Sequence, residues 1–125
     1  MTHPLVTPEM IEAYQRDGVA FIPGLFADFV DVLRDGVDRN MRDPGPYAAE
    51  NLKDGEAGRF FDDYCNWDRI PEFRKSVYES PAAEVAADLM QSPLVQMFHD
   101  HVLVKEPGTN KATPWHTDGP YYFVS

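Results

Sequence analysis

One change in residue type constrains the fold of this chain more than any other feature. Before the Ser92-Pro93 pair the sequence carries helix signals, whereas from Leu94 onward it carries residues typical of β-strands. Helices that come first and strands that come later are typical of an α+β domain or of a β-barrel buttressed by helices. At 125 residues the chain is long enough for one domain with one modest core.

Two helix signals stand out in the first third of the chain. Thr7 can cap a helix that begins at Pro8 and stops at Gly18, so a helix is predicted over residues 8–17. A second helix is expected after Asp28, which can cap it. Its apolar residues recur every four positions and would form one core-facing stripe: Phe29, Leu33, Val37 and Met41.

The middle of the chain predicts shorter elements. Residues 19–22 indicate a short buried strand, and residues 44–59, rich in Gly, Pro and charge, indicate a long loop. Helices are expected over residues 72–79 and 81–90, the second of them capped by Ser80.

The strand-like part begins with one long segment. Residues 95–106 predict a strand, residues 107–114 a polar loop, and residues 115–124 the next strand, while the aromatic segment 60–67 fits either class. Because side chains alternate along a strand, one face of the long strand would carry His99, His101, Leu103 and Lys105.

The segment Trp115-His116-Thr117-Asp118 places a histidine and a carboxylate one residue apart. On a strand, residues i and i+2 point to the same face, so His116 and Asp118 could reach one metal ion. One imidazole and one carboxylate are two of the three ligands in the facial triad that binds non-haem Fe(II). The spacing therefore predicts a metal site that still needs a third ligand.

The residues around this segment carry a wider similarity. Val102-Leu103-Val104-Lys105-Glu106-Pro107-Gly108, followed by Pro114 to Phe123, resembles the phytanoyl-CoA dioxygenase family of iron- and 2-oxoglutarate-dependent oxygenases. The stretch from Tyr14 to Phe26 is similar to the N-terminal helix, strand and turn of that family. The resemblance implies a double-stranded β-helix, a jelly roll of eight strands, of which the strand candidates here make up about half. We therefore expect residues 1–125 to be the N-terminal part of a single oxygenase domain, with an incomplete jelly roll.

The resemblance also implies roles for individual residues. His116 and Asp118 would bind Fe(II), and Lys105 and Thr117 would contact 2-oxoglutarate. Three aromatic residues either wall a substrate pocket or pack in the core or barrel rim, and both interpretations stay open: Trp115, Tyr121 and Tyr122. The family's distal histidine, and the basic residue after it that binds the 2-oxoglutarate carboxylate, have no counterpart after Asp118.

We interpret the chain as a fragment of such a hydroxylase, and two alternatives stay open. His99 and His101 could join His116 in a three-histidine site. The chain could instead be a non-enzymatic interaction module, or a half-barrel that completes its fold by dimerisation. A hydrophobic fraction of 43% requires burial, and a half-barrel would expose apolar surface that a second copy could cover.

Charge and cysteine content exclude some classes of function. Eleven basic residues against 21 acidic ones give a net charge of −10, which argues against nucleic acid as a partner. Cys65 is the single cysteine, so no intrachain disulfide can form, and this suits a reducing cytoplasm. No segment approaches the ~20 apolar residues of a membrane span. The expectation is a cytoplasmic protein that acts on a small organic molecule, bound to neither nucleic acid nor membrane.

Overall fold

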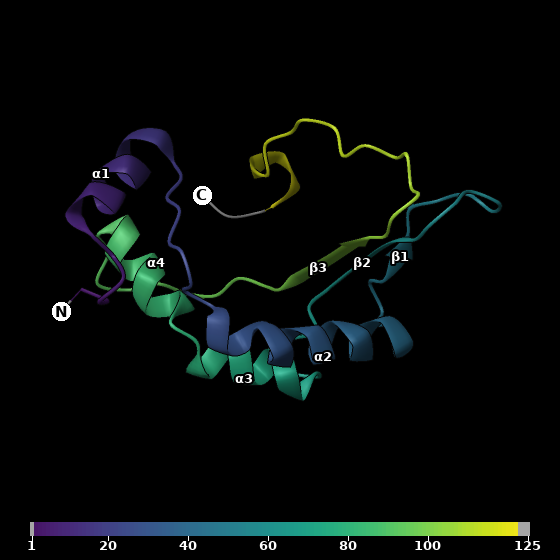
Figure 1. Ribbon diagram of the computed structural model, residues 1–125, viewed down its shortest axis with the longest axis horizontal. Helices are drawn as coiled ribbons and strands as arrows, with labels where there is room; N and C mark the ends of the chain where they lie inside the picture. Colours follow the sequence, from purple (N-terminus) through teal and green to yellow (C-terminus); the bar gives the residue numbers. More distant parts are fainter. Residues whose placement is uncertain (1, 123–125) are drawn as a thin grey trace.

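The computed structural model describes residues 2–122, which combine helices with a small antiparallel sheet. The helices are α1 (Pro8–Asp17), α2 (Val30–Arg42), α3 (Pro71–Glu79) and α4 (Ala82–Met90), with 3-10 turns η1 (Ala27–Phe29) and η2 (Gly119–Tyr121). The strands are β1 (Ala49–Glu50), β2 (Phe60–Tyr64) and β3 (His101–Lys105), paired in the order β1-β2-β3. Figure 1 shows α2 and α3 together along one side of the sheet, and α1 with α4 at one end of the molecule. The α+β class is confirmed, whereas the jelly roll stays a prediction.

The core lies between the sheet and helices α2 and α3. Its buried residues are Phe61, Ile70, Phe73 and Val102. The apolar stripe predicted for α2 is confirmed for Leu33, Val37 and Met41, which pack against this core, whereas Phe29 lies in η1 before the helix. The ambiguous segment 60–67 supplies the central strand, since β2 pairs with β1 on one edge and with β3 on the other.

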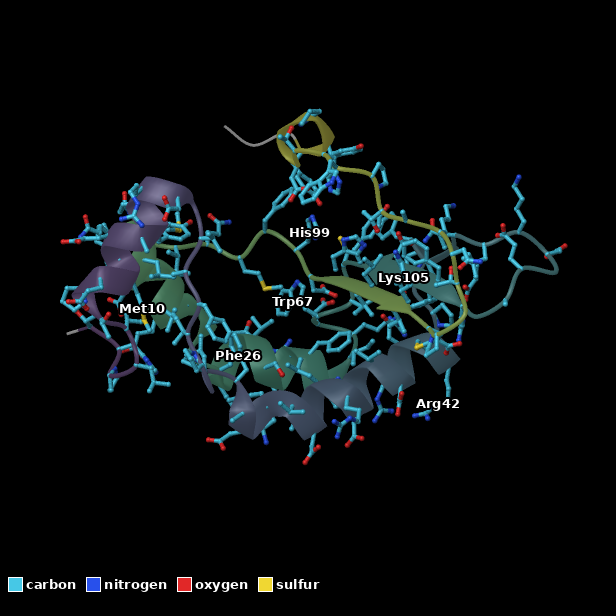
Figure 2. The ribbon with its side chains drawn as sticks, turned by 45° about the horizontal axis from the view of Figure 1, so that its top comes forward. Met10, Phe26, Arg42, Trp67, His99 and Lys105 are labelled. Carbon is cyan, nitrogen blue, oxygen red and sulfur yellow. The ribbon has the colours of Figure 1, made fainter. Side chains whose placement is uncertain are left out.

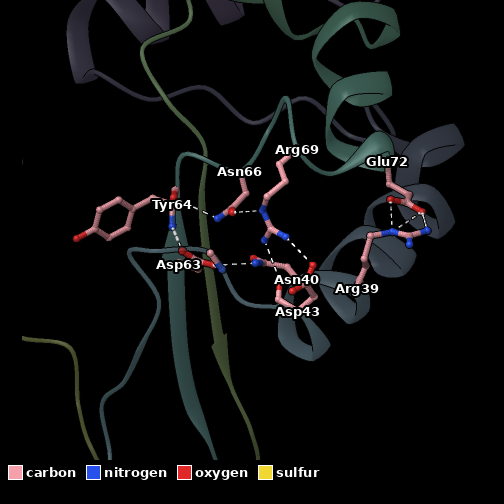
Figure 3. A network of polar contacts seen from close by, with 9 residues as sticks. Arg39, Asn40, Asp43, Asp63, Tyr64, Asn66, Arg69 and Glu72 are labelled. Atoms are coloured by element: carbon pink, nitrogen blue, oxygen red, sulfur yellow. Dashed lines mark hydrogen bonds and ion pairs between the residues drawn. The ribbon is translucent and has the colours of Figure 1, made fainter.

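A buried polar network fixes the loop after α2 to the central strand (Figure 3). The fully buried carboxylate of Asp63 accepts hydrogen bonds from Gly45 N–H (2.7 Å), Asn40 Nδ2 (2.8 Å) and Tyr64 N–H (2.9 Å). Burial is the largest single influence on the pKa of Asp63 and raises it, but these hydrogen bonds together with one from Asn66 bring the pKa below its ordinary value. The network therefore holds a charged carboxylate inside the fold.

The local helix signals are largely confirmed. Thr7 Oγ1 accepts a hydrogen bond from Met10 N–H at 3.3 Å, and Gly18 ends α1 in the left-handed region at φ 74°. At α4 the helix begins at Ala82 with Pro81 as its N-cap residue and no side-chain cap, so the cap predicted at Ser80 is not confirmed, although Ser80 Oγ accepts from Ala82 N–H at 3.4 Å. The cap at Asp28 is wrong, because η1 intervenes and α2 begins at Val30 without a side-chain cap.

The observed strands differ more from the predicted ones than the helices do. Residues 19–22 do not form the predicted strand, since no strand among the described residues pairs with them, and Phe21 is 82% exposed. The long strand over residues 95–106 contracts to β3, which is as long as its five-residue partner β2. Residues 44–59 are not entirely loop, because β1 forms within them.

The predicted strand over residues 115–124 is wrong for its described part. Residues 114–118 are irregular, and η2 follows them, so this segment joins no sheet within the part of the chain that the structure describes. Residues 123 and 124 lie outside the described residues. Without a partner strand, the backbone turns at Gly119-Pro120 instead of extending.

The two faces of the sheet differ. Val102 is buried and Val104 half-buried on the helix side, while His101, Leu103 and Lys105 are exposed, as the alternation predicted. We call the side away from the helices the open face; it carries Phe60, Asp62, Tyr64, His101, Leu103 and Lys105. Residues 106–122, here the strap, arch over this face in Figure 1.

A large apolar hollow lies between the helices and the approach to β3. Its volume is about 650 Å³. Residues that line it include Phe26, Phe29, Leu33, Phe73, Val95 and Val102. None of the helices formed by residues 2–122 combines the length and the apolar character that crossing a bilayer requires.

Candidate metal centre

The side chains of His116 and Asp118 converge at the end of the strap. His116 Nε2 lies 3.3 Å from Asp118 Oδ1. His116 Nδ1 lies 2.8 Å from the carbonyl oxygen of Pro114, which can only accept, so Nδ1 is the donor. In the neutral imidazole, Nε2 then carries the lone pair and faces the carboxylate. A backbone carbonyl that holds the second ring nitrogen is one of the common supports of a metal-binding histidine.

This spacing suits two ligands of one ion. Ligand atoms about 2.1 Å from a metal and at right angles to each other lie about 3 Å apart. Imidazole nitrogen and carboxylate oxygen are also the donor types of the non-haem Fe(II) triad. The pair therefore fits two of the three protein ligands of such a site, and both side chains are open to solvent.

A turn, and not the predicted strand, brings the two residues together. Asp118 has φ −77° and ψ −24°, and its carbonyl oxygen accepts a hydrogen bond from Tyr121 N–H at 2.8 Å. The ligand pair thus stands at the N-terminal end of η2. The predicted convergence is present, although its backbone cause differs.

A third ligand is missing from the described residues. Within residues 2–122, no three His, Cys, Asp or Glu side chains gather closely enough to hold a metal ion. His99 Nδ1 donates to the carbonyl of Asp100 at 3.1 Å, and His101 Nε2 faces Asp62 Oδ2 at 3.8 Å. The three-histidine alternative is therefore not supported by this part of the chain.

The two residues assigned to 2-oxoglutarate lie at different places. Lys105 is on the open face, where Nζ is 3.4 Å from Thr113 Oγ1 and 4.5 Å from the centre of the Phe60 ring. Thr117 is exposed on the strap between the two candidate ligands. Their role in binding the cosubstrate stays a prediction.

The three predicted pocket aromatics also separate. Trp115 is fully exposed. The ring of Tyr121 stands edge-on to the ring of His116, with 6.0 Å between centroids. Tyr122 points to the irregular segment before β3, where its ring contacts Phe98 and His99. Only Tyr121 therefore contacts the ligand pair among these three, and a substrate-binding role for any of them stays a prediction.

A row of rings on the open face was not predicted from the sequence. Tyr47 stacks on Tyr64 with 5.6 Å between centroids and 5° between planes, and Tyr64 meets the edge of His101 at 5.2 Å. The alternation of β2 could have placed Tyr64 on this face, but only its pairing with β3 shows that His101 lies opposite it.

Comparison with known proteins gives a family match. The family model described as phytanoyl-CoA dioxygenase (PhyH) matches residues 14–125, which include the sheet, the strap and the ligand pair. No curated protein and no solved structure matches the chain.

Proposed function

The chain belongs to the phytanoyl-CoA dioxygenase family, a group of Fe(II)- and 2-oxoglutarate-type oxygenases, and from this premise we propose that it provides two iron ligands of a hydroxylase. The observation that carries the proposal is the His116–Asp118 pair at 3.3 Å, with His116 Nδ1 held by a backbone carbonyl. The proposed substrate is a small organic molecule, and the net charge of −10 argues against nucleic acid in that role.

Four residues of the chain have a definite physical task in this proposal. Iron with 2-oxoglutarate supplies the oxidising power for an unactivated C–H bond. His116 presents a neutral nitrogen, and Asp118 presents a charged oxygen that offsets part of the charge of the ion. Lys105 offers an ammonium to a carboxylate of 2-oxoglutarate, and Thr117 offers a hydroxyl.

The third protein ligand and the second cosubstrate contact come, in this proposal, from outside residues 2–122. The described residues provide no third ligand next to the pair. The open face also carries exposed aromatic and imidazole rings that further strands would cover. Both observations support the interpretation of this chain as one part of a larger oxygenase domain.

Anaerobic Fe(II) titration, with and without 2-oxoglutarate, tests the proposal. His116→Ala and Asp118→Ala should each weaken Fe(II) binding by more than about a hundredfold, since even a supporting contact is worth ten- to a hundredfold. Thr117→Ala should retain Fe(II) and bind 2-oxoglutarate less tightly. His3→Ala removes a histidine far from the pair in the sequence and serves as the control.

Equal Fe(II) binding by the wild type, His116→Ala and Asp118→Ala would refute the proposal. The same titration on the product of the whole reading frame would show whether residues beyond those described raise the affinity. A metal-to-cosubstrate absorbance band that needs both His116 and Asp118 would support the assignment.

Self-association is a second candidate function, favoured by the apolar hollow of about 650 Å³ beside β3. Exposed Leu103 also lines this hollow, and exposed Leu94 and Phe98 adjoin its lining residues Val95 and Met97 in the sequence. A second copy that covers the hollow would complete a half-barrel without further residues. Analytical ultracentrifugation should then show a dimer that Leu103→Lys dissociates. A monomer at every concentration would exclude this function.

A further inference from the structure

We propose that Tyr122 is a positioning residue for the metal centre: its ring packs on Phe98 and His99, and this latch holds the His116–Asp118 pair above the open face. The inference rests on the iron site proposed above. It separates the roles of two neighbouring tyrosines that the sequence alone treats alike.

The latch is the point at which the exposed strap returns to the folded domain. Every residue from 110 to 121 is exposed, whereas Tyr122 is half-buried. Its ring meets Phe98 edge-on with 5.5 Å between centroids, and it meets His99 at 5.1 Å. Both distances lie in the range of about 4.5–7 Å in which aromatic pairs attract beyond simple burial.

A short hydrogen-bonded turn connects this latch to the ligand pair. Tyr122 N–H donates to the carbonyl of Gly119 at 3.4 Å, and Tyr121 N–H donates to the carbonyl of Asp118 at 2.8 Å. The ring of Tyr121 stands against His116. Because η2 is one closed turn, a shift of Tyr122 moves Asp118 and, through Tyr121, His116.

The surface that receives Tyr122 is itself fixed to the core. His99 Nδ1 donates to the carbonyl of Asp100, and the Asp100 carboxylate accepts from Asn66 N–H and Trp67 N–H, both at 2.9 Å. Asn66 is fully buried. Figure 2 shows His99 between the approach to β3 and the turn that ends the strap. The ring of Tyr122 therefore rests on a surface that is fixed to the core, and this contact restricts the motion of the strap.

Glu106 N–H donates to the carbonyl of Arg59 at 2.8 Å and holds the start of the strap, but the side-chain contacts further along it are weaker anchors. Lys105 Nζ reaches Thr113 Oγ1 at 3.4 Å, and Lys111 Nζ donates to the carbonyl of Asn51. Exposed lysine contacts of this kind contribute little, because the long side chain loses rotamer freedom when it is held. The ring contacts of Tyr122 are therefore the stronger constraint on the ligand pair.

Two measurements on the 125-residue chain test the latch. Backbone ¹⁵N order parameters for residues 115–121 report strap order in the metal-free protein, and anaerobic Fe(II) titration reports the ligand pair. In Tyr122→Ala the order parameters should fall below about 0.6, a value typical of flexible backbone. Fe(II) binding should weaken about tenfold, the equivalent of one or two aromatic pairs.

Matched variants separate positioning from folding. Tyr122→Phe keeps the ring and should restore both readouts to wild-type values. Phe98→Ala removes the other side of the latch from a residue that is 60% exposed, so it should reproduce Tyr122→Ala without harming the core. Tyr78, on α3, has a comparable ring contact with Trp67; Tyr78→Ala removes it and should leave strap order and Fe(II) affinity unchanged.

The outcomes distinguish the latch from the iron site. Unchanged order parameters in Tyr122→Ala would overturn the latch, and a disordered strap with unchanged Fe(II) affinity would overturn its positioning role. Failure of the wild type to bind Fe(II) would overturn the proposed function and the positioning role that depends on it. The order parameters would still decide whether the latch exists. Loss of both readouts, with rescue by Tyr122→Phe, supports the inference.

Discussion

Replacement of Asp63 by alanine should destabilise the fold strongly, because it removes the acceptor that ties the loop after α2 to β2. The carboxylate accepts from Gly45 N–H, Asn40 Nδ2 and Tyr64 N–H at 2.7–2.9 Å. Asp63 and Asn40 are fully buried, so water cannot replace the lost acceptor without a rearrangement. The substitution leaves donors without a partner inside the protein.

The cost follows from the number of donors affected. A buried donor left unpaired costs about 1–3 kcal/mol of stability. Loss of the two bonds from Gly45 and Asn40 should therefore lower the free energy of unfolding by about 2–6 kcal/mol. A domain of this size has a free energy of unfolding of about 5–15 kcal/mol. Asp63→Ala should therefore remove a large fraction of the stability. Asp63→Asn retains an acceptor oxygen and should cost less, about 1–3 kcal/mol.

Urea unfolding at pH 7 measures these differences through the midpoint and slope. Asp62→Ala is the matched control, because its side chain lies on the open face beside His101 and has no part in the network. The control should change the free energy of unfolding by about 1 kcal/mol or less. If Asp63→Ala unfolds within about 1 kcal/mol of Asp62→Ala, the network does not stabilise the fold and the reasoning fails.

The pH dependence provides an independent check. The pKa of Asp63 is lower in the folded protein than its ordinary value of 3.8, because the hydrogen bonds outweigh the effect of burial. A lowered pKa contributes stability that is present above the unfolded value and is lost as the pH falls through the folded one. The gap between the wild type and Asp63→Asn should thus stay constant from about pH 7 to 5 and narrow below about pH 4. A gap that widens in acid would contradict the assigned charge state.

Two further substitutions test packing and capping. In Gly36→Ala the new Cβ would lie 2.6 Å from Phe73 Cε1. Overpacking should cost about 1–3 kcal/mol, which exceeds the gain in helix propensity, so the melting temperature should fall. In the control Gly119→Ala the new Cβ meets nothing within 4 Å, and the melting temperature should not change. A more stable Gly36→Ala would show that the ring moves freely. Thr7→Ala removes the hydrogen bond to Met10 N–H and should cost about 1 kcal/mol in thermal unfolding; an unchanged melting temperature would mean that α1 does not depend on its cap.

The helices were predictable because their signals are local. Thr7 and Gly18 act within one turn of the helix they delimit, and the α2 stripe depends only on spacing along one helix. Asp28 shows the limit of this reasoning: it is a good capping residue, but it lies in η1 and does not cap α2. A local preference of about 1 kcal/mol is small against the packing of a whole helix.

The strands were less predictable because pairing is not local. Phe61 pairs with Val104, and β1 depends on a register with β2 that no short segment encodes. Residues 19–22 have strand-like composition but no partner among the described residues, so they remain outside the sheet. The buried carboxylate of Asp63 was missed for the same reason, since its partners come from α2 and from the loop that follows it.

The sequence by itself determined the family of this protein and the spacing of its two proposed ligands, His116 and Asp118. Tertiary structure alone decided how these donors are held, since a turn brings them together and the ring of Tyr122 connects that turn to Phe98 and His99. The physical reason is the sequence separation of the residues involved. Residue identity and spacing supply ligand atoms, whereas their position in space depends on contacts between segments that only the folded chain brings together.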